Sequence, residues 1–132
     1  MKMADLNVGD QVPELRVTPD KFLPHRYAGA SGDFNPIHID DEFARAVGLP
    51  RNILHGLYSM GLVARANTAL AGGDPRGLKR LSVQFRGMGM PEQEIVVSGT
   101  VESVDGDRVV VDTVATQGDT EIIKNAQAEI QL

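Results

Sequence analysis

Residues 56–71 read GLYSMGLVARANTALA, the longest apolar stretch of the chain, and Arg65 is its only charged residue. A helix that is apolar on most sides must be covered by the rest of the domain. The stretch stops at residues 72–75 (GGDP), because glycine permits left-handed closure and proline cannot continue the hydrogen-bond ladder. We therefore predict a central helix over residues 56–71. The small residues that we expect to admit close backbone approach are Gly61, Ala64 and Ala66.

The sequence that follows this helix has an apolar period of two instead of a helical one. From Lys79 onward, Leu81, Val83 and Phe85 are expected on one side of a half-buried strand. Further strands are predicted at 94–104, 108–117 and 121–132. Short connections that contain Gly-Asp separate these segments and are typical of hairpins. We predict that the four strands form one antiparallel meander.

The sequence before the central helix gives weaker signals. The predicted elements are a strand over 11–18, a helix that begins at Thr18 or Asp20 and ends near Gly29, and a short helix over 40–47 that begins at Asp40. Residues 31–40 (SGDFNPIHID) contain a glycine and a proline, so we predict an irregular loop there.

The order of these elements indicates one α+β domain over residues 1–132, with an antiparallel sheet wrapped around the central helix. A single sheet leaves the edges of its outer strands unpaired, and such edges attract another copy of the chain. We therefore expect a homodimer or a higher homo-oligomer.

The composition excludes several classes of protein. The 132 residues include 18 acidic and 13 basic side chains, a net charge of -5, without a run of basic residues that would follow a phosphate backbone. The polar beginning and the lack of a long apolar window favour a cytoplasmic protein that binds neither nucleic acid nor membrane. The chain has no cysteine, which excludes disulfides and thiolate metal sites.

The loop at residues 31–40 concentrates groups that exchange protons. A carboxylate with an ordinary pKa near ~3.9 and an imidazole with one near ~6.5 can both act close to neutral pH once burial shifts them. Asp33 and His38 are separated by Asn35-Pro36, a pair that favours a turn, so both side chains can meet on one water molecule. Asn35 can donate and accept, which suits it to orient one of them.

Gly56 begins the predicted central helix, where backbone N–H groups lack helical partners and the helix dipole is positive. A thioester carbonyl placed against the Gly56 N–H would be polarised, and negative charge developing on its oxygen would be stabilised. Glycine also admits a ligand closely because it has no side chain.

Residues 27–40 (YAGASGDFNPIHID) resemble the signature of MaoC-like, type-2 (R)-specific enoyl-CoA hydratases, and residues 53–57 (ILHGL) resemble the second motif of that family. The resemblance implies a hot-dog fold, usually dimeric, and reversible hydration of a trans-2-enoyl thioester. It further implies that Asp33 and His38 are the catalytic dyad, Asn35 their supporting residue and Gly56 the oxyanion-hole amide. Either member of the dyad can be the base in this scheme.

Other residues have both a structural and a functional interpretation. Tyr58 and Ser59 can line an acyl pocket or pack in the core, and His55 can hold the turn before the helix. Arg80 belongs to a group of basic residues that could bind a nucleotide phosphate. A metal held by Asp33, His38 and Asp40 is a weaker alternative, and we expect neither a metal nor a redox cofactor.

Three functions are compatible with these motifs. The first is (R)-specific hydration of enoyl-CoA; the second is dehydration of a 3-hydroxyacyl group on acyl carrier protein. The third is binding of acyl-CoA without catalysis. Some relatives act only with a degenerate partner subunit, so a heterodimer with a related hot-dog chain is a further alternative. Nothing in the motifs determines the length of the acyl chain.

Overall fold

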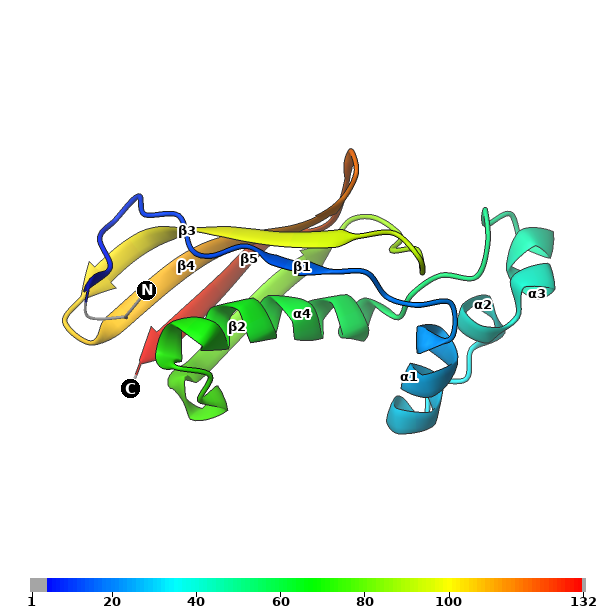
Figure 1. Ribbon diagram of the computed structural model, residues 1–132, viewed down its shortest axis with the longest axis horizontal. Helices are drawn as coiled ribbons and strands as arrows, with labels where there is room; N and C mark the ends of the chain where they lie inside the picture. The colour runs from blue at the N-terminus through cyan, green and yellow to red at the C-terminus, as the bar shows by residue number, and fades with distance from the viewer. Residues whose placement is uncertain (1–4, 132) are drawn as a thin grey trace.

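The computed structural model describes residues 5–131 and has the predicted α+β architecture, with a sheet packed along one long helix (Figure 1). The strands are β1 (Leu15–Val17), β2 (Leu78–Phe85), β3 (Ile95–Asp105), β4 (Arg108–Gln117) and β5 (Thr120–Gln131). The helices are α1 (Leu23–Ser31), α2 (Pro36–Ile39), α3 (Asp41–Ala46), α4 (Gly56–Thr68), and the short 3-10 turns η2 (Ala69–Ala71) and η3 (Pro75–Gly77). Residue 132, the last one in the predicted final strand, lies outside the described residues.

The five strands are antiparallel and lie in the order β1-β3-β4-β5-β2. The predicted meander of four strands is therefore wrong at β2, although β3, β4 and β5 do form a meander. The edge of β3 is already taken by β1, which pairs Leu15 with Val97 and Val17 with Ile95. The chain after β2 consequently crosses to the other side of the sheet before β3 begins, and β2 pairs with β5 instead.

Helix α4 begins and ends close to the predicted positions. It runs from Gly56, passes into η2 and stops at Gly72, whose φ of 70° is the left-handed conformation expected for glycine at a helix end. Its buried face carries Ser59, Leu62, Val63, Ala66 and Asn67. On this face the helix packs against the inward residues of the sheet.

The predicted role of Gly61 in close packing is wrong, because Gly61 is exposed and a β-carbon added there would meet no atom within 4 Å. A helical step of about 100° per residue places it two positions, and so about 200°, from the buried Ser59 and Val63. Ala64 is half-buried, and Ala66 alone of the three lies fully on the buried face.

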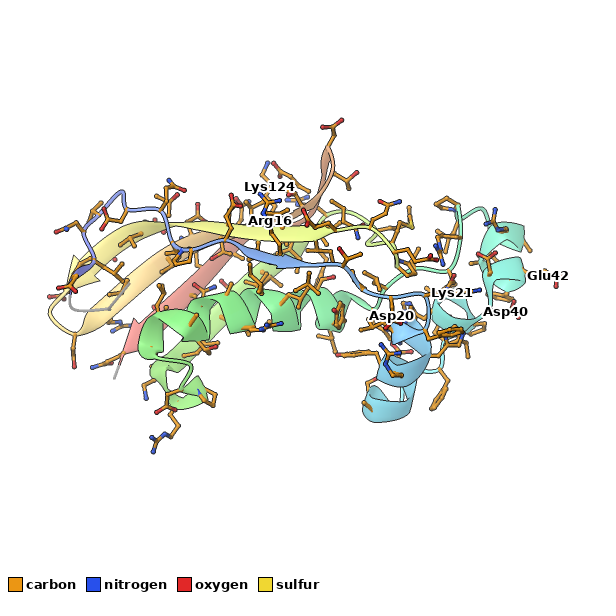
Figure 2. All side chains as sticks on the ribbon, in the orientation of Figure 1. Arg16, Asp20, Lys21, Asp40, Glu42 and Lys124 are labelled. Carbon is orange, nitrogen blue, oxygen red and sulfur yellow. The ribbon has the colours of Figure 1, made fainter. Side chains whose placement is uncertain are left out.

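The segment between β1 and α4 forms a small group of helices beside the N-terminal end of α4 (Figure 1). Helix α1 begins later than predicted, because the Asp20 carboxylate accepts the Phe22 N–H in a turn and does not cap the helix. The pKa of Asp20 is held below its ordinary value by the hydrogen bond from Arg26, an exposed pair. Figure 2 shows Asp40 and Glu42 on the outer side of this helical group.

The prediction of an irregular loop at residues 31–40 is also wrong in part, since α2 lies inside it. Asn35 accepts the Ile37 N–H with its side chain, and Pro36 at the first position has the backbone angle that a helix start requires. The next short helix, α3, begins as predicted after Asp40, whose carboxylate accepts the Phe43 N–H at 3.1 Å. No helix within the described residues combines the length and apolar character that a membrane crossing requires.

Candidate active site

Asp33 lies in the turn between α1 and α2, just after Gly32, which has a φ of 79°. Its Oδ1 accepts the backbone N–H of Asn35 at 3.1 Å. Together with the cap that Asn35 provides to α2, this bond fixes the direction of the carboxylate. The side chain of Asp33 remains 53% exposed, so it is accessible to water and to a ligand.

His38 lies on α2 and is buried, with 8% of its surface exposed. Its Nδ1 is 2.8 Å from the carbonyl oxygen of Ile53. Because a carbonyl oxygen only accepts, Nδ1 carries a hydrogen, and Nε2 of the neutral imidazole is then an acceptor. Nε2 lies 3.8 Å from Oδ2 of Asp33. Two acceptors at this separation can each take one hydrogen of the same water, at about 2.8 Å from its oxygen.

A second set of hydrogen bonds holds the backbone of His38. The side-chain amide of Asn52 donates to the His38 carbonyl at 2.9 Å, and the Asn52 N–H donates to the Asp41 carboxylate at 3.1 Å. The pKa of Asp41 is lowered, first by the hydrogen bond from Arg45 and also by this backbone N–H. Residues 52 and 53 therefore form a rigid support for α2.

His55 is buried and stacks on His38, with ring centroids 3.9 Å apart and planes at 20°. Its Nε2 donates to the carbonyl oxygen of Asp33 at 3.0 Å, which is the turn-holding role predicted for it. Tyr27 contacts the His55 ring at 4.7 Å between centroids. The Nδ1 of His55 has no hydrogen-bond partner among the described residues. His55 thus ties the backbone of Asp33 to the ring of His38.

Gly56 begins α4 and lines the same region as the dyad. Among the described residues, no acceptor is found for this N–H, whereas the Tyr58 N–H bonds to the carbonyl of His55. A β-carbon at Gly56 would lie 3.1 Å from Cε1 of Phe85. The free N–H at a helix start is an arrangement that stabilises negative charge on an oxygen.

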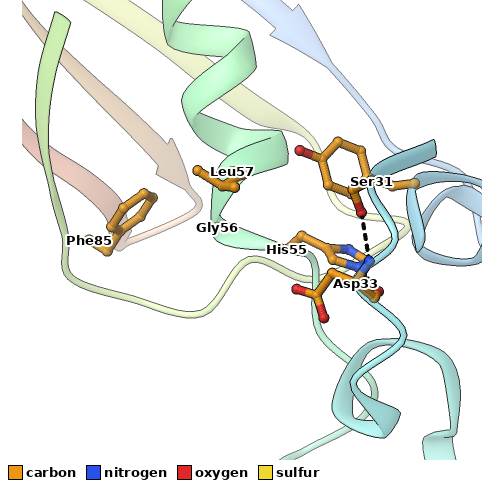
Figure 3. A pocket seen from close by; sticks show the side chains of 7 residues that line it. Ser31, Asp33, His55, Gly56, Leu57 and Phe85 are labelled. Atoms are coloured by element: carbon orange, nitrogen blue, oxygen red, sulfur yellow. Dashed lines mark hydrogen bonds between the residues drawn. The ribbon is translucent and has the colours of Figure 1, made fainter. Parts of the chain in front are cut away.

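Two adjoining pockets meet at Gly56 and Phe85. The first, of about 270 Å³, is the one drawn in Figure 3, with Phe85 across from Asp33 and His55. Its lining residues are Tyr27, Ser31, Asp33, His55, Gly56, Leu57 and Phe85. The second, of about 170 Å³, is lined by His38, Ile53, Leu54, Gly56, Ser59, Phe85, Gly87, Met88, Gly89, Ile122 and Ile123. The dyad therefore has one member in each pocket.

The structure separates the other predicted site residues. Ser59 lines the second pocket, but Tyr58 lines neither pocket and packs partly against the core. Burial raises the pKa of the Tyr58 hydroxyl. Arg80 lies on β2 five positions before Phe85, or about 16 Å along the strand, and lines neither pocket. Arg80 therefore lies outside these two pockets, and its role in binding a nucleotide phosphate stays a prediction.

Several lining residues were not predicted as part of the site. Phe85 was expected to be inward with Leu81 and Val83, and its ring does point towards α4 at Gly56. However, β2 ends beside the start of the helix, where the core also ends, so 53% of Phe85 is exposed at the pocket. Leu57, which follows Gly56 at the start of α4, is likewise exposed and lines the first pocket. Their exposure depends on where α4 begins relative to β2, which the alternation of residues in β2 does not indicate.

A metal would find three ligand atoms here, since those of Asp33, His38 and His55 lie within 4.8 Å of one another. The alternative set with Asp40 does not form, because that carboxylate caps α3. Zinc ligands converge on one point, whereas the lone pairs of two rings stacked at 20° run nearly parallel. The geometry suits a water molecule better than a metal.

The chain is similar to several known proteins. The chain is 36% identical over 94 residues to the peroxisomal enoyl-CoA hydratase 2 of Arabidopsis thaliana, covering 70% of this chain and 29% of that protein. It is 34% identical over 119 residues to the enoyl-CoA hydratase ChsH3 of Mycobacterium tuberculosis, covering 86% of this chain and 40% of that protein.

A solved structure of a MaoC-like dehydratase matches with a TM-score of 0.92 and 30% sequence identity, over 99% of this chain and 42% of that one. The chain thus spans less than half the length of these relatives. The sheet and its long helix form the hot-dog fold that the motifs implied. Since the family model described as a MaoC like domain also matches residues 7–125, the chain belongs to the MaoC-like domain family.

Proposed function

We propose that this chain adds water across the double bond of trans-2-enoyl thioesters to give (R)-3-hydroxyacyl thioesters, and catalyses the reverse dehydration. The observation that carries this proposal is the 3.8 Å separation of His38 Nε2 and Asp33 Oδ2, beside the free N–H of Gly56. These groups supply a place for water and a place for the thioester oxygen within one site.

The dyad would hold the attacking water by both of its hydrogens. Because Nδ1 of His38 donates to the Ile53 carbonyl, Nε2 of the neutral ring and Oδ2 of Asp33 both accept hydrogens from the water. The lone pairs of the water oxygen are then free to point at the substrate. The oxygen attacks the β-carbon while one dyad atom takes the proton. The dyad then returns a proton to the α-carbon, so that the H and OH of one water are added to the double bond.

Gly56 would stabilise the charge that this attack produces. As the C–O bond forms, the electron pair of the double bond moves towards the thioester carbonyl and builds an enolate oxygen. The Gly56 N–H and the positive end of α4 stabilise that oxygen most strongly in the transition state. We assign Asn35 a positioning role, because its backbone orients Asp33 and its side chain begins α2.

Hydration of crotonyl-CoA and longer enoyl-CoAs, followed by the loss of enoyl absorbance, tests the proposed function. We expect Asp33→Asn and His38→Gln each to lower kcat by a factor of ~10²–10⁴, the usual contribution of a proton-transferring group. Asp112→Asn, which changes an exposed carboxylate on β4, is the matched control and should retain full activity. Full activity in both dyad variants would refute the mechanism, and an (S)-configured product would refute the stereochemistry.

We also propose that the working form is a homodimer. Strand β2 has eight residues and forms one outer edge of the sheet, and the exposed apolar Leu57 and Phe85 lie at its end next to the pocket. Long edge strands with adjoining apolar side chains favour pairing with another chain. The native mass of the purified protein tests this, and a monomer at assay concentration would contradict it.

A further inference from the structure

Gln117 is a buried polar residue in a row of otherwise mostly apolar positions. Its 5% exposure places it at the end of the inward face of β4. The residues of that row are Val109, Val111, Thr113, Ala115 and Gln117. A primary amide in such a place is unfavourable unless its donors and acceptor are all satisfied. Its partners therefore indicate what the residue does.

All three hydrogen bonds of the Gln117 side chain go to the backbone of the segment between β2 and β3. Its Oε1 accepts the Met90 N–H at 2.8 Å, and its Nε2 donates to the carbonyls of Met90 at 2.7 Å and Gln93 at 3.0 Å. We call this segment, residues 86–94, the crossing loop. One side chain thus gives the crossing loop the partners that a neighbouring strand would otherwise provide.

The crossing loop is also a wall of the second pocket. Gly87, Met88 and Gly89 line that pocket, opposite His38 and Ser59. A β-carbon at Gly89 would lie 3.2 Å from Cδ1 of Leu54, so the loop packs tightly against the pocket floor.

A hydrogen bond connects this wall to the dyad. The carbonyl of Gly89 accepts the Leu54 N–H at 2.8 Å, and Leu54 follows Ile53, whose carbonyl holds Nδ1 of His38. The position of the crossing loop is therefore coupled both to the width of the pocket and to the support of the imidazole.

We propose that Gln117 is a positioning residue that fixes the crossing loop and thereby limits the size of the acyl group that fits beside His38. This proposal rests on the proposed function, in which the second pocket receives the acyl chain. Other contacts hold the loop before and after Met90: Arg86 and Gly87 donate to the Ile122 carbonyl, the Gly89 carbonyl accepts the Leu54 N–H, and the Glu92 N–H donates to the Pro19 carbonyl. Gln117 holds the middle, where Met90 follows the lining residues.

Removal of the amide should let the middle of the loop move outward. The Met90 N–H and the carbonyls of Met90 and Gln93 lose their partners, and they can regain hydrogen bonds by turning to water. Short acyl chains then lose contacts with Met88 and Gly89, whereas longer ones gain room. The expected change is in KM and in the preference for chain length more than in kcat.

The test compares kcat/KM for four-carbon and eight-carbon enoyl-CoAs in Gln117→Met and Gln117→Leu. We expect the preference to move towards the longer chain by about five- to tenfold, the effect of up to one methylene in a tight pocket. Thr113→Val is the matched control, because Thr113 is equally buried in the same row and bonds Asn67 instead of the loop. Its preference should stay within about twofold of the unchanged protein.

Hydrogen exchange of the peptide that contains Met90 separates this proposal from the proposed function. If the unchanged protein hydrates no enoyl thioester, the proposed function fails, yet faster exchange in Gln117→Met than in Thr113→Val still supports the anchoring of the loop. Equal exchange, or equal chain-length preference in a folded variant, would overturn the proposal. Failure of both Gln117 variants to fold would also overturn it, by making Gln117 a residue of global stability.

Discussion

The two sides of the site are built in different ways. The polar side, with Asp33, His38 and the backbone of residues 52–56, comes from two short segments that are close in sequence and tied by hydrogen bonds. The apolar side collects single residues from distant elements, including Phe85 of β2, Met88 of the crossing loop and Ile122 of β5. The chemistry is therefore encoded locally, and the shape of the pocket is encoded by the whole fold.

This difference has a consequence for how each side tolerates change. A substitution on the polar side alters groups that would touch the reacting atoms, so its effect is expected mainly in kcat. A substitution on the apolar side alters only the space available, so its effect is expected in KM and in substrate preference.

Gly56→Ala tests the polar side and should have the largest effect of the substitutions that compare the two sides. The added methyl lies 3.1 Å from the Phe85 ring, at a position that lines both pockets, so it would compete with a thioester for the space beside the N–H. We expect kcat/KM to fall by about 100-fold, similar to the removal of one oxyanion donor. Steady-state kinetics with crotonyl-CoA measures it.

Gly61→Ala is the control for that variant. Gly61 is on the exposed face of the same helix with open space around it, so alanine should leave activity unchanged. It should also raise stability by about 0.5–1 kcal/mol through helix propensity. An equal loss of activity in both variants would show that the helix, and not the Gly56 amide, is responsible.

Phe85→Ala tests the apolar side and should have an intermediate effect. The ring lines both pockets, and its removal enlarges the space in each of them. We expect KM for crotonyl-CoA to rise by about tenfold, because the acyl chain loses an apolar contact equivalent to about two methylene groups. The KM of branched or longer substrates should rise less, because their acyl groups can fill the added space. Kinetics across a series of acyl groups provides the measurement.

Phe43→Ala serves as the comparison, because Phe43 on α3 is also partly exposed and lines neither pocket. Its kinetics should not change. If Phe85→Ala alters kcat for every substrate equally and leaves KM unchanged, the division between a chemical side and a shape-giving side is incorrect.

The same difference explains what the sequence predicts and what it does not. The helix over residues 56–71 follows from composition and from the stop at Gly72, and the start of α3 follows from Asp40 as a cap. Asp33 and His38 meet because Asn35-Pro36 turns the chain within a few residues. These features depend on residues close together in the sequence, so hydrophobic periodicity and helix-capping residues are enough to predict them.

The failures concern relations between distant segments. Strand β2 pairs with β5 because β1 already pairs with the edge of β3. The alternation of apolar and polar residues in β2 does not indicate which strand will be its neighbour. The lining of the pockets by Phe85 and Leu57 depends in the same way on where α4 begins relative to the strands. Gln117 occupies a position of β4 that the alternation predicts to be inward, and a buried amide must have hydrogen-bond partners. This position therefore indicated, from the sequence, a polar contact with another segment.

Acid stability should show the smallest effect and tests whether the polar side is held locally. The folded protein lowers the pKa of Asp41, so its contribution to stability is complete above the ordinary pKa near ~3.9 and is lost as the pH falls through the lower folded value. Asp41→Asn should therefore flatten the decline of stability in this acidic range. Denaturant unfolding at pH 6 and at about pH 3.5 measures the difference.

Asp74 provides the comparison at the other end of α4, since its pKa is lowered by Arg76 and its contacts do not reach His38. Asp74→Asn should flatten the same decline. Asp41→Asn alone should speed hydrogen exchange at Asn52 and Ile53, because Asp41 holds the Asn52 N–H and Ile53 bonds the backbone of α2. Equal exchange in the two variants would mean that the support of His38 is spread over the whole fold, and the polar side would then not be locally encoded.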